Sequence, residues 1–146
     1  MNRRSLIYVA LASLTLDGNY DLTAGAFDRA SGHLFITENN GPGNRIVELS
    51  PVTGAQLAAV PAPFNVQSWA GLAIDPATGH LWLGAVNGGP QLVEFRIDAV
   101  GTLTELRRID TRAQGLDQNE ISGLSFGPGG SIWVASTQGE IYRFTV

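Results

Sequence analysis

Three stretches of the chain repeat one pattern: AGAFDRASGHLFIT at 24–37, AGLAIDPATGHLWL at 70–83 and SGLSFGPGGSIWVA at 122–135. Each copy starts with small residues around a glycine, passes through a turn and ends in an apolar segment with a central aromatic residue. The copies recur at roughly 45–50 residues, a period typical of structural repeats. Short apolar segments between turns rich in Gly, Asp and Pro indicate β-strands. The repeats therefore predict an all-β fold.

Each repeat carries further strands after this shared pattern. A third strand is expected at 45–49, 91–95 and 140–144, and a fourth at 55–60 and 102–109 in the first two copies. Four short strands per repeat of this length are typical of a β-propeller blade, in which four antiparallel strands run outward from a central channel. The chain is therefore expected to form three blades.

The aromatic residues Phe35, Trp82 and Trp133 occupy one equivalent position, in the second strand of each repeat. Large aromatic side chains bury much apolar surface, and this alone explains their recurrence. We expect them to fill the space between neighbouring blades.

The third repeat ends at Val146 without a fourth strand, whereas an extra strand is expected before the first repeat, from Ser5 to Leu16. That N-terminal strand is expected to serve as the fourth strand that the last blade lacks. The prediction is one half-propeller domain over 1–146, with an outer strand and loop at 1–22 and blades at 23–62, 69–111 and 120–146.

Three blades do not close a ring, since known propellers have about four to eight. Two chains supply six blades, and a two-fold dimer uses the same surfaces on both subunits. We therefore expect a C2 homodimer forming one six-bladed propeller, in which the N-terminal strand of each chain completes the last blade of its partner. The alternative is that the chain is a fragment of a longer propeller.

The N-terminus also allows a second interpretation. Arg3 and Arg4 precede an apolar stretch, and Ala10-Leu11-Ala12 resembles a signal-peptide cleavage site. The protein would be cytoplasmic if Met1 is retained and exported otherwise, so the compartment stays open. The apolar stretch is shorter than the roughly 20 residues that span a bilayer, so no membrane association is expected.

Composition excludes several classes of function. The chain of 146 residues has a net charge of −4, and its nine basic residues are all arginine, which argues against a nucleic-acid partner. It contains no cysteine, so disulfides, thiolate zinc sites and cysteine nucleophiles are excluded. No phosphate-binding loop, dinucleotide fingerprint or nucleophile elbow is present.

The segment 34–49, with Thr53-Gly54 after it, resembles the YVTN repeat of bacterial propellers, in which a Tyr-Val-Thr-Asn strand precedes an Asn/Gly loop and a Thr-Gly turn. The segment 74–82 is similar to the Asp-Pro-x-Thr-Gly turn shared by YVTN and NHL repeats. The strict YVTN tetrad is absent. The resemblance covers about 24–146 and implies a propeller. It leaves function open, because such repeats occur in binding scaffolds, lactonase- and lyase-type enzymes and surface-layer proteins.

In a propeller, the loops before the first strand and after the second strand of each blade gather around the channel. Here those loops are rich in amide, carboxylate and aromatic side chains, which suit a small molecule, a sugar or a protein ligand. Each of these residues is also a common turn former. No resident cofactor is predicted, although carboxylate and amide oxygens could bind Ca²⁺ or Mg²⁺. The candidate ligand-binding residues are Glu38, Asn39, Asn40, Asn65, Gln67, Trp69, Asn87, Asn119, Glu120 and Gln138.

The sequence favours a non-catalytic binding scaffold over an enzyme. Lactonase-type propellers carry a metal-binding glutamate just before the glycine of the first strand, where this chain has Ala24, Ala70 and Ser122. The alternative is a metal-dependent lactonase or lyase that uses Glu38, Asn87 or Glu120.

Two further pairs of polar residues occupy equivalent positions in the first two repeats. The pair His33 and His80 points to a structural role, because a catalytic histidine is usually unique. The pair Asp28 and Asp75 precedes a turn, and we expect both carboxylates to cap it.

Overall fold

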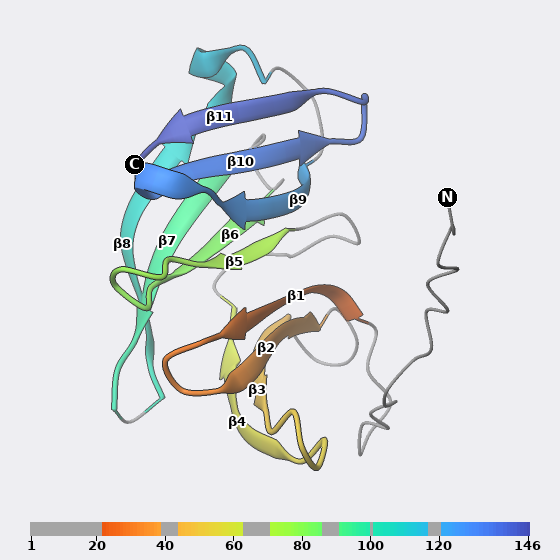
Figure 1. Ribbon diagram of the computed structural model, residues 1–146, viewed down its shortest axis with the longest axis vertical. Coiled ribbons are helices and arrows are strands. Elements are labelled where there is room, and N and C mark those ends of the chain that lie inside the picture. Colours follow the sequence, from red (N-terminus) through yellow and green to blue (C-terminus); the bar gives the residue numbers. More distant parts are fainter. Residues whose placement is uncertain (1–21, 39–43, 63–70, 86–90, 100, 117–120) are drawn as a thin grey trace, which may run out of the picture.

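The computed structural model describes residues 22–38, 44–62, 71–85, 91–99, 101–116 and 121–146, and these residues form three antiparallel β-sheets of four, four and three strands (Figure 1). Sheet 1 comprises β1 (Leu22–Asp28), β2 (His33–Glu38), β3 (Arg45–Leu49) and β4 (Gln56–Pro61). Sheet 2 comprises β5 (Leu72–Ile74), β6 (Leu81–Ala85), β7 (Gln91–Ile97) and β8 (Leu103–Asp110). Sheet 3 comprises β9 (Ile121–Phe126), β10 (Ser131–Ser136) and β11 (Ile141–Thr145).

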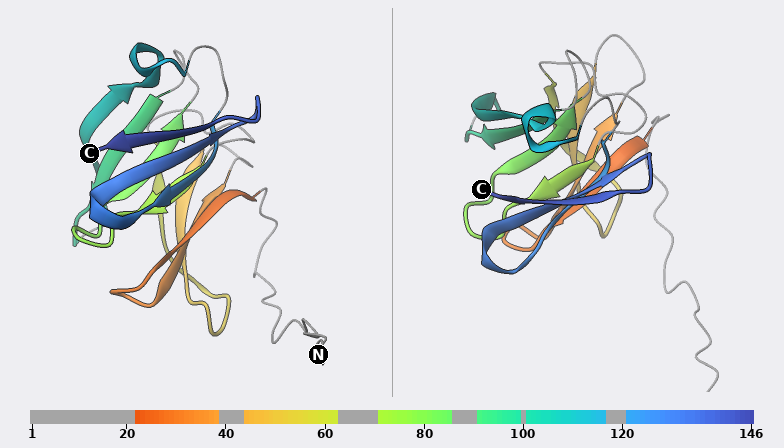
Figure 2. Two further views of the ribbon diagram at one scale, coloured as in Figure 1. Left: turned by 45° about the horizontal axis from the view of Figure 1, so that its top comes forward. Right: turned by 90° about the horizontal axis from the view of Figure 1, so that it is seen from above.

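The strand order confirms an all-β fold built from three similar sheets. In each sheet, every strand pairs with the strand that follows it along the chain. The expected fourth strands at 55–60 and 102–109 are found, each displaced by one residue. The expected N-terminal strand at 5–16 lies outside the described residues. The three sheets follow one another side by side, with sheet 2 in the middle (Figure 2).

The turns between the first two strands of sheets 1 and 2 share one construction. Asp28 Oδ1 accepts a hydrogen bond from the backbone N–H of Ala30 at 3.0 Å, and Asp75 Oδ1 accepts the corresponding bond from Ala77 at 2.9 Å. A glycine with positive φ then returns the chain into the second strand, at 74° for Gly32. Such a conformation costs glycine little. The predicted capping role of Asp28 and Asp75 is confirmed.

Two apolar cores hold the sheets together. Between sheets 1 and 2, Phe35, Ile46 and Val60 pack against a set from sheet 2 that includes Leu83 and Phe95. Between sheets 2 and 3, the contributors from sheet 2 are Trp82 and Leu92, and those from sheet 3 are Ile132, Val134 and Phe144. Sheet 2 thus presents one face to sheet 1 and the opposite face to sheet 3.

The repeated aromatic position behaves differently in the three sheets. Phe35 is 9% exposed and Trp82 is fully buried, both in the core toward the following sheet. Trp133, in the same position of sheet 3, is 40% exposed. The predicted packing role is therefore confirmed for Phe35 and Trp82, while Trp133 lies on the outer face of the last sheet.

The outer face of sheet 1 is also apolar. Ile36, Val47 and Leu49 form a third buried cluster there. On the same face, Phe27 is 55% exposed and Leu57 is 49% exposed. Both ends of the three-sheet arrangement therefore carry exposed large apolar side chains.

Strand register corrects the alignment of the repeats by their glycines. Position for position, the residue of β1 that corresponds to Gly71 and Gly123 is Ala24, because Ala24 pairs with Thr37 just as Gly123 pairs with Ala135. Gly25 is one residue out of register. The reason is the shorter first copy, which has one residue fewer between its glycine and Asp28 than the second copy has between Gly71 and Asp75.

The segment after β8 begins with one short helical turn, the 3-10 helix Thr111–Gln114. Asp110 caps this turn by accepting the N–H of Arg112, and Gly115 ends it with a φ of 90°. Leu116 follows and is fully buried in the core between sheets 2 and 3. Across the described segments, no helix has the length and apolar character needed to cross a bilayer.

Candidate functional site

Most of the predicted ligand-binding residues lie outside the described part of the chain. These are Asn39, Asn40, Asn65, Gln67, Trp69, Asn87, Asn119 and Glu120. Their proposed grouping around a channel mouth therefore stays a prediction. The structure places the remaining two, Glu38 and Gln138.

Glu38 ends β2 and is 3% exposed. It pairs across the hairpin with Arg45, whose Nε donates a hydrogen bond to Glu38 Oε2 at 2.8 Å and whose guanidinium Nη2 contacts the same oxygen. A buried carboxylate needs such a partner, because an unpaired charge out of water is costly. In this structure Glu38 therefore joins two strands.

Gln138 lies in the exposed turn between β10 and β11. Its backbone N–H donates a hydrogen bond to Ser136 Oγ at 3.1 Å, which stabilises the turn. The Gln138 side chain is exposed.

A groove of about 950 Å³ runs along the first strands of the three sheets. Its walls come from β1, β5 and β9 and from the turns that follow them, and these strands lie next to one another in Figure 1. Representative wall residues are Ala26, Ala73 and Ser125, which occupy equivalent register positions opposite the repeated aromatic residues. The three repeats therefore contribute matching segments to one site.

The groove extends to the end of the β1–β2 hairpin that lies away from Glu38. Asp28 and Asp75 line it, and Asp28 pairs with His33 at one end of the β1–β2 hairpin. Glu38 pairs with Leu22 at the other end of this hairpin. Sequence reasoning placed the site on the loop side and missed this end, although the repeated Asp-to-Gly turns mark it.

Asp28 is the titratable group of the groove with a perturbed pKa. Burial raises its pKa. Hydrogen bonds from Ser31 and from the backbone N–H of Ala30, together with the nearby His33, lower the pKa by more than burial raises it. The pKa of Asp28 therefore lies below its ordinary value of 3.8. The carboxylate is consequently ionised at neutral pH and holds the turn.

Each of the two histidines is bound by a glutamate on the neighbouring strand. His33 Nδ1 lies 2.5 Å from Glu48 Oε1, and His80 Nδ1 lies 2.8 Å from Glu94 Oε1. The same pair recurs in the same place in sheets 1 and 2, which supports the structural role expected of both histidines. The glutamate partners were not foreseen from the sequence, because the pairs join residues 15 and 14 positions apart.

Sheet 2 extends its His–Glu pair into a larger cluster. Glu94 Oε2 accepts a hydrogen bond from Arg107 Nε at 3.1 Å and lies 3.0 Å from Arg107 Nη2. The guanidinium carbon of Arg107 lies 4.9 Å from the ring centre of Trp82, a cation–π arrangement. His80, Glu94, Arg107 and Trp82 therefore form one layer on the face of sheet 2 toward sheet 3.

Among the described residues, no three His, Cys, Asp or Glu side chains converge in a way that could hold a metal ion. Of the residues suggested for the enzyme alternative, Glu38 is paired with Arg45, and Asn87 and Glu120 are outside the described residues.

No family model matches the sequence, and no curated protein matches it. Among solved structures, the chain is similar to the crystal structure of the computationally designed Ika4 protein, with 15% sequence identity and a TM-score of 0.47. The match covers 94% of this chain and 99% of that one. A likeness of this size carries no conclusion about the site or its ligand.

Proposed function

We propose that the chain is a non-catalytic binding scaffold: half of a six-bladed β-propeller of the YVTN/NHL type, closed by a second copy of itself. The groove along β1, β5 and β9 would then become part of a central ligand channel. One observation carries the proposal. The two outer faces of the three-sheet arrangement correspond, position for position, to the two kinds of face that are buried between its sheets.

The outer face of sheet 3 corresponds to the faces that Phe35 and Trp82 occupy. Trp133 pairs with Arg143, as Trp82 pairs with Glu94 and Phe35 with Glu48. In sheets 1 and 2 this face is covered by the next sheet. In sheet 3 it leaves Trp133 40% exposed, and Ile141 nearby is 72% exposed.

The outer face of sheet 1 corresponds to the face of sheet 2 that packs against the preceding sheet. The pair Ile36 and Val47 is equivalent to the pair Leu83 and Val93, which packs against sheet 1. Sheet 1 carries the exposed Phe27 on this face. Ile36 and Val47 are already buried within the chain, so the open part of this face is the exposed Phe27 and Leu57. We expect the exposed apolar residues of both end faces to be covered by a partner, because exposed patches of this kind mark interaction sites.

A second copy of the chain would cover the exposed apolar faces at both ends. In a two-fold dimer, sheet 3 of each chain packs on sheet 1 of its partner, and the contact forms twice. The edge of β11, which among the described strands pairs only with β10, would take the partner's N-terminal strand. Two chains of three sheets would give six blades, within the range of known propellers.

The test is the absolute mass by light scattering over a dilution series, with variants at both end faces. We expect twice the 15.5 kDa chain mass for the natural sequence, and 15.5 kDa for Trp133→Asp and for Phe27→Asp. Val52→Asp is the matched control, because Val52 is 86% exposed in a turn and should keep the dimer mass. A natural chain of 15.5 kDa at all concentrations, or a dimeric Trp133→Asp variant, overturns the closure.

Binding is tested on the same material by NMR titration with panels of small sugars and short peptides. The expected shifts fall on amides of the groove, such as Ala26, Ala73 and Ser125. A lactone substrate with Ca²⁺ or Mg²⁺ tests the enzyme alternative. Hydrolysis above background that Glu38→Gln abolishes would refute the non-catalytic role.

A further inference from the structure

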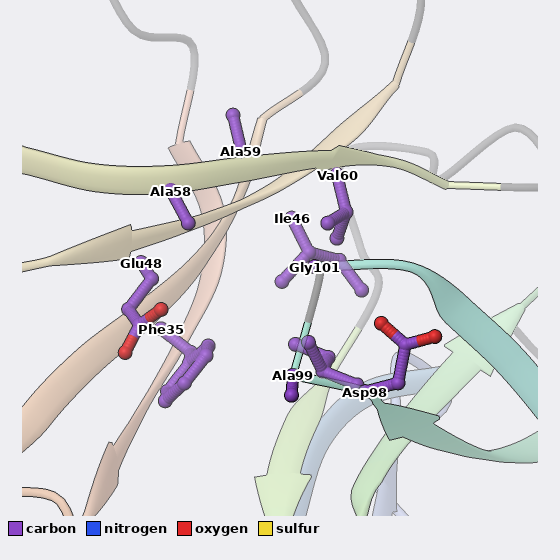
Figure 3. A pocket seen from close by; sticks show the side chains of 10 residues that line it. Phe35, Ile46, Glu48, Ala58, Ala59, Val60, Asp98, Ala99 and Gly101 are labelled. Atoms are coloured by element: carbon purple, nitrogen blue, oxygen red, sulfur yellow. The ribbon is translucent and has the colours of Figure 1, made fainter.

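A second cavity, of about 310 Å³, lies between sheets 1 and 2 and is separate from the groove. Phe35, Glu48 and Ala58 from sheet 1 line one side, and Ile97 and Asp98 from sheet 2 line the other. Figure 3 shows the carboxylates of Glu48 and Asp98 on opposite sides of this space. Its walls are otherwise mostly apolar.

Sheet 2 shows what fills the equivalent space in its own repeat. Arg107 on β8 pairs opposite Glu94 on β7, which pairs opposite Trp82 on β6. The Arg107 guanidinium binds Glu94 Oε2 and lies over the Trp82 ring. A cation held between a carboxylate and an aromatic face is a favourable arrangement.

Sheet 1 has the same acceptors without the cation. Ala58 pairs opposite Glu48, and Glu48 opposite Phe35, so Ala58 stands where sheet 2 has Arg107. A β-bulge follows both Glu48 and Glu94, which confirms the equivalence. Glu48 Oε1 binds His33, while within the described residues no hydrogen-bond donor reaches Glu48 Oε2. In sheet 2 the corresponding oxygen is the one that Arg107 occupies.

We propose that this cavity is a binding site for an organic cation, a guanidinium or primary ammonium group on a short aliphatic chain. The cationic head takes the place that Arg107 has in sheet 2, against Glu48 Oε2 and over the Phe35 ring. The aliphatic chain lies along Ile97 and Ala58. Asp98, whose Oδ1 accepts the N–H of Thr102 at 2.8 Å, places a second negative charge on the far wall.

The chemistry selects against other ligands. Two carboxylates facing one small space disfavour an anion, since like charges in partly desolvated surroundings repel strongly. The apolar walls favour an organic cation over a hydrated metal ion, which needs several oxygen ligands. The site lies within one chain and does not depend on closure by a second copy.

The direct test compares ethylguanidinium with ethylurea, a neutral probe of nearly the same shape. NMR titration of the natural protein should show at least tenfold tighter binding of ethylguanidinium, with shifts at Phe35, Glu48 and Ala58. Glu48→Gln should remove that preference. Equal affinity for the two probes, or a preference unchanged in Glu48→Gln, overturns the proposal.

Two substitutions test the correspondence between the sheets. Ala58→Arg supplies the guanidinium from the chain itself and should weaken probe binding at least tenfold. Ala113→Arg introduces the same side chain at an exposed position away from the cavity and should leave binding unchanged. Arg107→Ala should create a second site in sheet 2, so that ethylguanidinium raises its Tm more than that of the natural protein.

Each outcome bears on the proposal in one direction. Undiminished binding to a folded Ala58→Arg variant overturns it. If Ala58→Arg does not fold, Glu48→Gln and Arg107→Ala provide the test. Ethylguanidinium should then raise the Tm of Arg107→Ala by more than it raises the Tm of the natural protein. An equal or smaller rise counts against the equivalence of the two sheets. These results are independent of the light-scattering mass, so a failed dimer and a failed cation site are told apart.

Discussion

Replacing Gly71 by alanine places a methyl group against the backbone of the neighbouring sheet. The added Cβ would lie 2.7 Å from the backbone nitrogen of Leu124 and 2.8 Å from the carbonyl carbon of Gly123. Ordinary contacts of a Cβ atom begin at 3.4 Å. Sheets 2 and 3 would therefore have to separate locally by about 0.7 Å, and close-packed interiors resist such shifts.

The size of the effect follows from what must move. Overpacking a core costs about 1–3 kcal/mol, and the lower values apply where a side chain can rotate away. Here the obstruction is backbone, so we expect the free energy of unfolding to fall by about 2–3 kcal/mol. For a chain of this length, that corresponds to a Tm lower by roughly 5–10 °C.

Urea unfolding followed by circular dichroism measures the change, and Gly123→Ala is the matched control. Gly123 has the equivalent position in sheet 3, but its added Cβ would meet only the Ala135 methyl, at 3.7 Å. Alanine is also favoured over glycine within a strand, so Gly123→Ala should be neutral or stabilising. If the two variants agree within about 0.5 kcal/mol, close approach of the sheets is not what Gly71 provides.

Gly84→Ala should destabilise through a side-chain clash, because its Cβ would lie 2.6 Å from Ile121 Cγ2. In urea unfolding, the cost of Gly84→Ala should shrink when it is made in an Ile121→Ala background, and simple additivity would contradict this prediction. Asp28→Asn should reduce the loss of stability in acid. Since the folded pKa of Asp28 lies below 3.8, its contribution is complete above that value and is lost as the pH falls through the folded pKa. Thermal unfolding from pH 6 to pH 2 should show a shallower decline in the variant, and parallel curves would refute it.

The sheets could be predicted because their signals are local. The Asp-to-Gly-His turns at 28–33 and 75–80 combine carboxylate capping with a glycine of positive φ, and both mark the start of a second strand. Strands on either side follow from alternating apolar residues. The interface role of Phe35 and Trp82 follows from their repetition.

The sites were harder to predict because they depend on register between distant strands. The sequence near Ala58 does not indicate a cavity. The cavity becomes visible only when the register shows that the small Ala58 lies opposite Glu48, where sheet 2 has the large Arg107 opposite Glu94. Register was itself obscured in the first repeat, where Gly25 is one position away from its apparent counterparts. The role of Glu38 could have been predicted from the sequence, since Arg45 lies opposite it across a short hairpin.

The strand order within the sheets has a consequence for how the chain folds. Among the described strands, every hydrogen-bonded neighbour is also the next strand along the chain, so each sheet is a series of hairpins that can form from a short segment. During synthesis, sheet 1 can complete its pairing before sheet 3 has left the ribosome. Docking of the sheets on one another would then follow their pairing. Sheet 2 contributes to both large cores, so neither core can be complete before sheet 2 is in place.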